Sequence, residues 1–135
     1  MPPENPPSRG AYSERVRELF RRGRYAGSLP KEEGFVVTAE ASEGGSGAVI
    51  ELSGRTDGGR WSSLRYRVFG CPHTIAAAEW AAEHFETAAV GAADPFPVDE
   101  IIEKLGVPVE KTGRILLLED AFRALEANRL ASLDK

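Results

Sequence analysis

The first half of the chain contains three segments in which apolar and polar residues alternate. Residues 35–41, 48–52 and 61–69 are rich in β-branched and aromatic side chains, which is typical of half-buried strands. Asp57-Gly58-Gly59 lies between the second and third segments and is a strong signal for a tight hairpin turn. Three consecutive strands with short connections predict an antiparallel meander.

Apolar residues at spacings of three and four predict helices on both sides of these strands. The first helix begins after Ser13 and ends at Gly23, and its apolar face consists of Tyr12, Val16, Leu19 and Phe20. The second follows Pro72, with Ile75, Ala78, Ala82, Phe85 and Ala89 on its apolar face and Glu79, Glu83 and Glu86 on its solvent side. Two more helices are predicted over 98–105 and from about residue 113, the last with Ile115, Leu118, Phe122 and Leu125 on its apolar face. This order predicts an α+β fold, a three-stranded antiparallel sheet with helices packed on it.

Composition narrows the class of protein. The 135 residues are 41% hydrophobic with a net charge of −4, which argues against a nucleic-acid partner. No apolar run reaches the roughly 20 residues needed to span a bilayer, and no apolar signal segment precedes the first helix, so a cytoplasmic protein without a membrane partner is expected. Four prolines within residues 1–10 predict a disordered tail, and residues 11–135 are expected to form one domain.

The only cysteine, Cys71, lies where the third strand pattern changes into a helix pattern. Gly70 permits a sharp turn, Cys71 falls at the expected N-cap and Pro72 at the first helical position. A thiol at a helix N-terminus is stabilised as thiolate by free N–H groups and by the helix dipole. The alternative is a small buried cysteine that only fills space. His73 is expected as a solvent-facing residue of the first turn, the alternative being a ligand or a base beside Cys71.

With the order of elements established, the chain resembles the U-type iron–sulfur cluster scaffold family, which comprises IscU and the N-terminal domain of NifU. The resemblance covers about residues 11–130 and is carried by Ala11-Tyr12-Ser13-Glu14-Arg15-Val16, Phe69-Gly70-Cys71 and Leu118-Glu119-Asp120-Ala121. It implies a scaffold protein rather than an enzyme. It also implies a role in iron–sulfur cluster assembly, with a cysteine desulfurase or another assembly protein as partner.

The chain departs from the family at the positions that hold the cluster. Ser46 and Ala48 stand where the family has a cysteine and an aspartate, and Arg114 stands where it has its last cysteine. Residues 107–111 retain only part of the family's Leu-Pro-Pro-Val-Lys motif. Because one thiolate cannot hold a cluster or a closed zinc site, an iron–sulfur cluster is implied by the resemblance alone and no zinc is expected.

Three hypotheses follow for Cys71. The first is a role in iron–sulfur biogenesis, either by holding a cluster across a homodimer through paired Cys71 residues or by accepting sulfur on this thiol. The second is a non-catalytic adaptor or regulator that keeps the scaffold fold. The third, a thiol enzyme with His73 as base, lacks any sign of an oxyanion hole or substrate pocket. By the family alignment Arg114 is expected beside Cys71, where its charge would lower the thiol pKa below about 8.5.

The basic character of the first helix has two interpretations. Five arginines lie between residues 15 and 24. They form either an ordinary solvated face or a surface that docks to an acidic partner.

Overall fold

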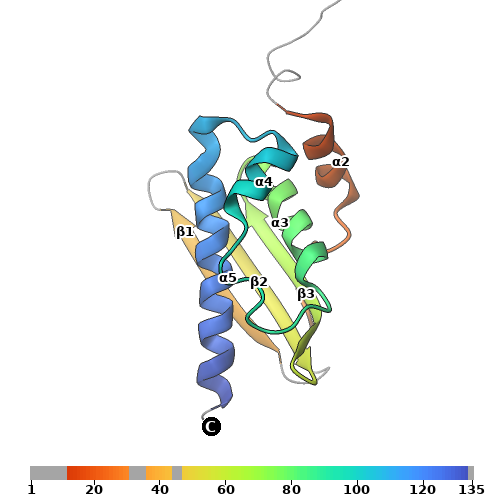
Figure 1. The fold of residues 1–135 in the computed structure, drawn as a ribbon, viewed down its shortest axis with the longest axis vertical. Helices are drawn as coiled ribbons and strands as arrows, with labels where there is room; N and C mark the ends of the chain where they lie inside the picture. The colour runs from red at the N-terminus through yellow and green to blue at the C-terminus, as the bar shows by residue number, and fades with distance from the viewer. Residues whose placement is uncertain (1–11, 31–35, 44–46, 134–135) are drawn as a thin grey trace, which may run out of the picture.

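A three-stranded sheet carries the main helices on one face in the computed structural model, which describes residues 12–30, 36–43 and 47–133 (Figure 1). The elements, in chain order, are α2 (Glu14–Arg22), β1 (Val37–Glu43), β2 (Ala48–Asp57), β3 (Arg60–Phe69), α3 (Pro72–Phe85), α4 (Val98–Leu105), the short 3₁₀ helix η2 (Val109–Lys111) and α5 (Thr112–Leu133). This arrangement confirms the predicted α+β fold. The proposed tail, residues 1–10, lies outside the described residues.

The sheet is an antiparallel meander with the order β1-β2-β3. The predicted turn joins β2 to β3, and Gly58 and Gly59 have φ values of 64° and 82°, which suit glycine. β2 is longer than the predicted segment 48–52, because the polar residues that follow also pair with β3. Backbone pairing, and not side-chain hydrophobicity, sets the length of this strand.

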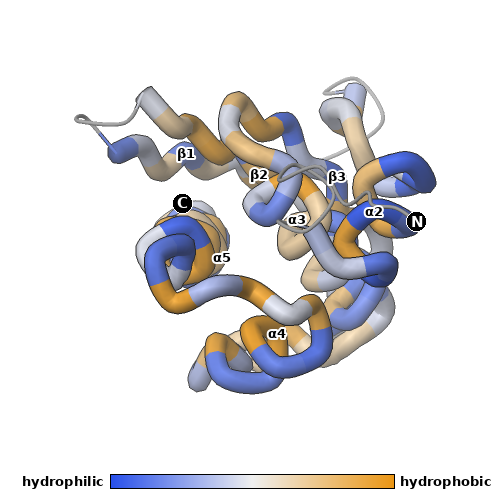
Figure 2. Tube along the Cα trace, turned by 90° about the horizontal axis from the view of Figure 1, so that it is seen from above, coloured by the Kyte–Doolittle hydropathy of each residue, from blue (hydrophilic) through white to orange (hydrophobic). Residues whose placement is uncertain are grey.

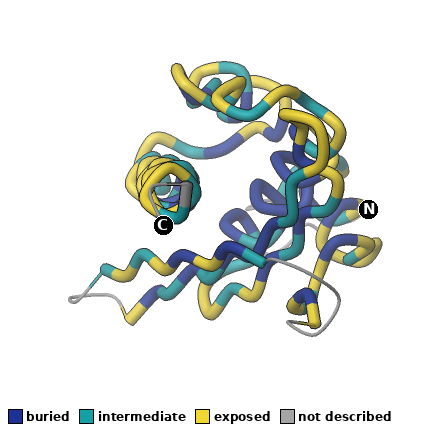
Figure 3. Tube along the Cα trace, turned by 90° about the horizontal axis from the view of Figure 1, so that it is seen from below, coloured by how far each residue is buried: buried dark blue, intermediate teal, exposed yellow. Residues whose placement is uncertain are grey.

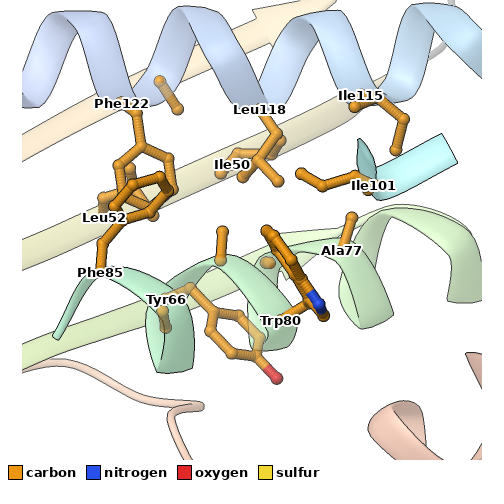
Figure 4. Packing of buried hydrophobic residues seen from close by; sticks show 14 of the residues in the cluster. Ile50, Leu52, Tyr66, Ala77, Trp80, Phe85, Ile101, Ile115, Leu118 and Phe122 are labelled. Carbon is orange, nitrogen blue, oxygen red and sulfur yellow. The ribbon is translucent and has the colours of Figure 1, made fainter. Parts of the chain in front are cut away.

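The core lies between the sheet and two helices, α5 over β1 and β2, and α3 over β3 (Figure 2). The predicted apolar face of α5 is confirmed, since its members are all buried: Ile115, Leu118, Phe122 and Leu125. Figure 4 shows Ile50 and Leu52 of β2 between this face and α3, with the rings of Phe85 and Phe122 packed at a tilt at one end of the core. These two ring centroids are 5.6 Å apart.

Helix α3 is buried on nearly all sides, as Figure 3 shows by its dark trace. The sequence predicted one apolar face and one solvent face, which is wrong for Glu79 and His73, since only 0% and 1% of their surfaces are exposed. The reason is that α2 packs on the side of α3 that faces away from the core. Small alanine side chains on α3 permit this close packing on two sides.

Helix α2 begins and ends at the predicted residues. The Ser13 hydroxyl accepts a hydrogen bond from the Val16 amide, and Gly23 ends the helix in the left-handed conformation. Val16 and Leu19 are buried as predicted, but Phe20 is 45% exposed and does not belong to the core. Among the described helices, none combines the length and apolar character that a bilayer-spanning segment needs.

Candidate functional site

Cys71 lies at the end of the molecule where β3 passes into α3. It is the N-cap residue of α3 with extended backbone angles, φ −81° and ψ 165°, and Pro72 is the first helical residue. The carbonyl of Cys71 accepts hydrogen bonds from the amides of Thr74 and Ile75. The predicted N-cap position is therefore confirmed, and the helix N-terminus directs its partial positive charge toward the thiol.

The surroundings of the half-buried thiol favour its charged form. Burial raises the pKa of Cys71, but the Thr74 hydroxyl, with its oxygen 3.5 Å from the sulfur, and the amides of Thr74 and His73 lower it. The positive charge of Lys111 acts in the same direction. Together these groups outweigh burial, so that the pKa of the thiol lies below its ordinary value.

Arg114 lies in the first turn of α5, and its guanidinium is bound to the carboxylate of Glu43 at the end of β1, with an N–O distance of 2.5 Å. Glu43 therefore balances much of the Arg114 charge, which the sequence analysis expected to lower the pKa of Cys71. Lys111, at the end of η2, supplies the cation that acts on the thiol instead. The ion pair ties α5 to the edge strand of the sheet, 71 residues away along the chain.

The other residues singled out in the sequence occupy different surroundings. Ala48 is buried at the start of β2, opposite Glu43 in the strand register, and Ser46 lies outside the described residues. His73 packs against Tyr12, with their ring centroids 4.9 Å apart, so that its first-turn position is buried and not solvent-facing. The other histidine of the chain, His84, is exposed and stacks on Trp80 at the other end of α3.

These surroundings do not fit a metal ion held by one chain. Among the described residues, no three His, Cys, Asp or Glu side chains lie close enough together to share a metal. Ala48 has no side-chain donor, Arg114 is paired with Glu43, and Lys111 brings positive charge to the surroundings of Cys71. A metal cation would therefore find one soft ligand and an unfavourable electrostatic field.

Sequence reasoning missed two groups that act on the thiol. Thr74 could have been found, because a hydroxyl three residues after an N-cap lies on the same side of the first turn. Lys111 could not be found from spacing alone, because the packing of η2 brings it toward Cys71. Thr74 belongs to no distinctive motif, whereas Lys111 ends the segment 107–111 that retains part of the family's motif.

The chain belongs to the NifU-like N-terminal domain family, since the sequence model of that family matches residues 11–128. The predicted family resemblance is thereby confirmed. Among the relatives, the chain is 29% identical to the iron–sulfur cluster assembly scaffold protein IscU of Haemophilus influenzae over 87% of its length and 94% of the relative. It is also 29% identical to a protein from Drosophila melanogaster that is named an iron–sulfur cluster assembly enzyme, over 87% of this chain and 77% of that protein.

Solved structures support the same fold. The putative iron–sulfur cluster assembly scaffold protein for the SUF system from Fervidobacterium islandicum superposes with a TM-score of 0.70 over 88% of this chain and 98% of that chain. The N-terminal NifU-like protein from Brucella abortus gives a TM-score of 0.55 over 90% of this chain and 86% of that chain. Because the identities are 14% and 15%, these likenesses concern the fold alone.

Proposed function

We propose that this chain serves iron–sulfur cluster assembly as a sulfur carrier that accepts sulfur on Cys71. The observation that carries the proposal is the setting of this thiol, which is half-buried at a helix N-terminus and has a lowered pKa. Membership of the scaffold family supplies the context of cluster assembly. A lone cysteine fits the reducing cytoplasm, where thiols stay free for such chemistry.

The chemistry needs a donor and no metal on this chain. A cysteine desulfurase carries the sulfur as a persulfide on its own cysteine. The Cys71 thiolate attacks the outer sulfur of that persulfide, a new S–S bond forms on Cys71, and the donor's S–S bond breaks. The donor leaves as a thiolate, so that sulfur moves without net oxidation or reduction. The Thr74 hydroxyl and the Lys111 charge stabilise the attacking anion.

The test is sulfur transfer in solution without oxygen. The chain is incubated with a cysteine desulfurase and L-cysteine, and its intact mass is measured before and after treatment with a thiol reductant. Wild type should gain the mass of one sulfur atom and lose it on reduction, whereas Cys71→Ser should gain none. Thr74→Val should gain it more slowly, because it removes the hydroxyl beside the sulfur. A wild-type chain that stays unmodified would refute the proposal.

A second candidate is an adaptor or regulator that keeps the scaffold fold. The Glu43–Arg114 ion pair favours it, because a guanidinium stands at the family's cysteine position. Stable binding to the desulfurase with no sulfur on Cys71 would support this candidate. A homodimer that holds a cluster through two Cys71 thiolates would instead give a visible absorbance band with near-stoichiometric iron and sulfide.

A further inference from the structure

Two aromatic side chains beside the candidate site stand out into solvent. Phe20 of α2 is 45% exposed, and Phe69 at the end of β3 is 61% exposed. They share one hollow, so that residues 49 positions apart in the sequence form a continuous apolar surface. Exposed aromatic residues that gather in this way are typical of contact surfaces between proteins.

Two hollows meet at Phe20. One has a volume of about 380 Å³ and is lined by Ala26, Val68, Phe69 and Ile75, among others. The second has a volume of about 280 Å³ and is lined by Tyr12, Val16, Arg17, Phe20, Arg21 and Pro72. We call the joint surface around Phe20, Phe69 and Pro72 the Phe20 surface. Its hollows are open and apolar, and each is large enough to receive a protruding apolar side chain.

Positive charge borders the Phe20 surface. Arg17 and Arg21 line the second hollow, and neither forms an ion pair with any described residue. By contrast, their helix neighbours Arg15 and Arg22 are bound to glutamates. The whole chain carries a net charge of −4, so that two arginines without an ion-pair partner among the described residues, beside exposed aromatic side chains, are a local feature.

The Phe20 surface borders the reactive thiol. Pro72 lines the second hollow and is bonded directly to Cys71, and Phe69 precedes Cys71 by two residues. A protein segment seated on this surface would therefore lie next to the N-cap residue of α3, which carries the half-buried thiol.

We infer that the Phe20 surface docks an acidic segment with protruding apolar side chains, carried by the protein that delivers sulfur to Cys71. The identity of that protein rests on the proposed function. Carboxylates of the segment bind Arg17 and Arg21, and its apolar side chains fill the hollows on either side of Phe20. A second copy of this chain is a poor occupant, because a two-fold contact would place the arginines of one copy near those of the other.

The experiment measures the affinity of the full chain for the cysteine desulfurase, in the Cys71→Ser background so that no sulfur chemistry contributes. Two variants change the surface: Phe20→Ser, and Arg17→Glu combined with Arg21→Glu. Control variants on α5 remove an exposed leucine near its C-terminal end, Leu130→Ser, and reverse an exposed arginine in its middle, Arg123→Glu. Thermal melting of each variant verifies that the fold is intact.

Each surface variant should weaken binding about tenfold or more, and the controls should bind as the parent chain does. Added salt should weaken binding of the parent chain but have a smaller effect on the arginine variant. Surface variants that bind like the parent, absence of binding by the parent, or self-association that these variants abolish would overturn the inference.

The outcomes for docking and for sulfur transfer are separable. If Cys71 acquires sulfur at the same rate in wild type and in the surface variants, the docking inference fails and the sulfur carrier stands. If binding depends on the surface but Cys71 never acquires sulfur, the docking surface stands and the sulfur carrier fails.

Discussion

Replacement of Glu79 by glutamine tests the buried carboxylate that joins α2, α3 and β3. The Glu79 side chain is 0% exposed, yet it accepts hydrogen bonds from four donors: Arg22 Nε at 2.7 Å, the Arg24 amide at 2.8 Å, the Tyr25 amide at 3.0 Å and the Tyr66 hydroxyl at 3.0 Å. Glutamine has the same shape, but it lacks the charge and presents an NH₂ group to these donors.

The expected cost follows from this geometry. Loss of the charge-assisted bond to Arg22 costs roughly 1.5–3 kcal/mol, and each buried amide left without an acceptor adds about 1–3 kcal/mol. With one amide left without an acceptor, the variant should therefore lose at least about 2.5 kcal/mol in free energy of unfolding. At about 4 °C per kcal/mol, the melting temperature should fall by at least about 10 °C.

Glu83→Gln is the matched control, since Glu83 lies one turn along α3 and binds the same arginine at 3.0 Å but is 41% exposed. Its loss should stay below about 1 kcal/mol, because solvent screens exposed ion pairs. Both variants are compared with wild type by urea unfolding at neutral pH. If Glu79→Gln lowers the free energy of unfolding no more than Glu83→Gln does, the buried carboxylate does not stabilise the fold as its hydrogen bonds indicate.

The pH dependence gives a second check on the same residue. Burial raises the pKa of Glu79, but hydrogen bonds from the Tyr25 amide, Arg22, the Arg24 amide and Tyr66 outweigh it and lower the pKa. A lowered pKa contributes stability above the value of the unfolded chain, about 4.3, and this contribution is lost as the pH falls through the folded pKa. The difference in stability between wild type and Glu79→Gln should therefore shrink on acidification below about pH 4.3.

Three further predictions concern the thiol and the core. The pH midpoint of Cys71 alkylation by iodoacetamide should lie below that of an unfolded cysteine, and a midpoint at or above the unfolded value would contradict this. Lys111→Ala should raise the midpoint more than Arg114→Ala does, because Glu43 already balances the charge of Arg114. The isolated chain should bind no zinc tightly by metal analysis, and one zinc per chain that Cys71→Ser abolishes would reveal further ligands. Phe85→Ala should cost roughly 3–5 kcal/mol by urea unfolding, and a loss below 1 kcal/mol would contradict its place in the core.

Local sequence signals predicted much of the fold. The turn at Asp57-Gly58-Gly59, the end of α2 at Gly23 and the buried face of α5 all depend on residues within a few positions of one another. The exposed position of Phe20 and the buried position of Glu79 could not be predicted in this way. Each depends on how α2 packs against α3, more than 50 residues away, and periodicity along one helix does not reveal a second covering helix.

The same distinction between local sequence signals and distant packing applies to the candidate site. The N-cap position of Cys71 and the direction of its pKa shift follow from the strand-to-helix transition and a following proline. The pairing of Arg114 with Glu43 joins residues 71 positions apart in the sequence, and the influence of Lys111 depends on the packing of η2. Sequence alignment gave the position of Arg114 in the fold, but not the carboxylate that accepts its hydrogen bond.

Because Cys71 lies at the start of α3, ionisation of its thiol is thermodynamically linked to folding. Because the folded chain lowers the thiol pKa, thermodynamic linkage requires that the thiolate stabilise the folded chain to the same extent. This contribution is present above the pKa of the unfolded thiol and is lost as the pH falls through the lower, folded value. A reagent that converts the sulfur into a neutral thioether removes this contribution to stability. Modification of Cys71 can therefore be measured as a change in the free energy of unfolding.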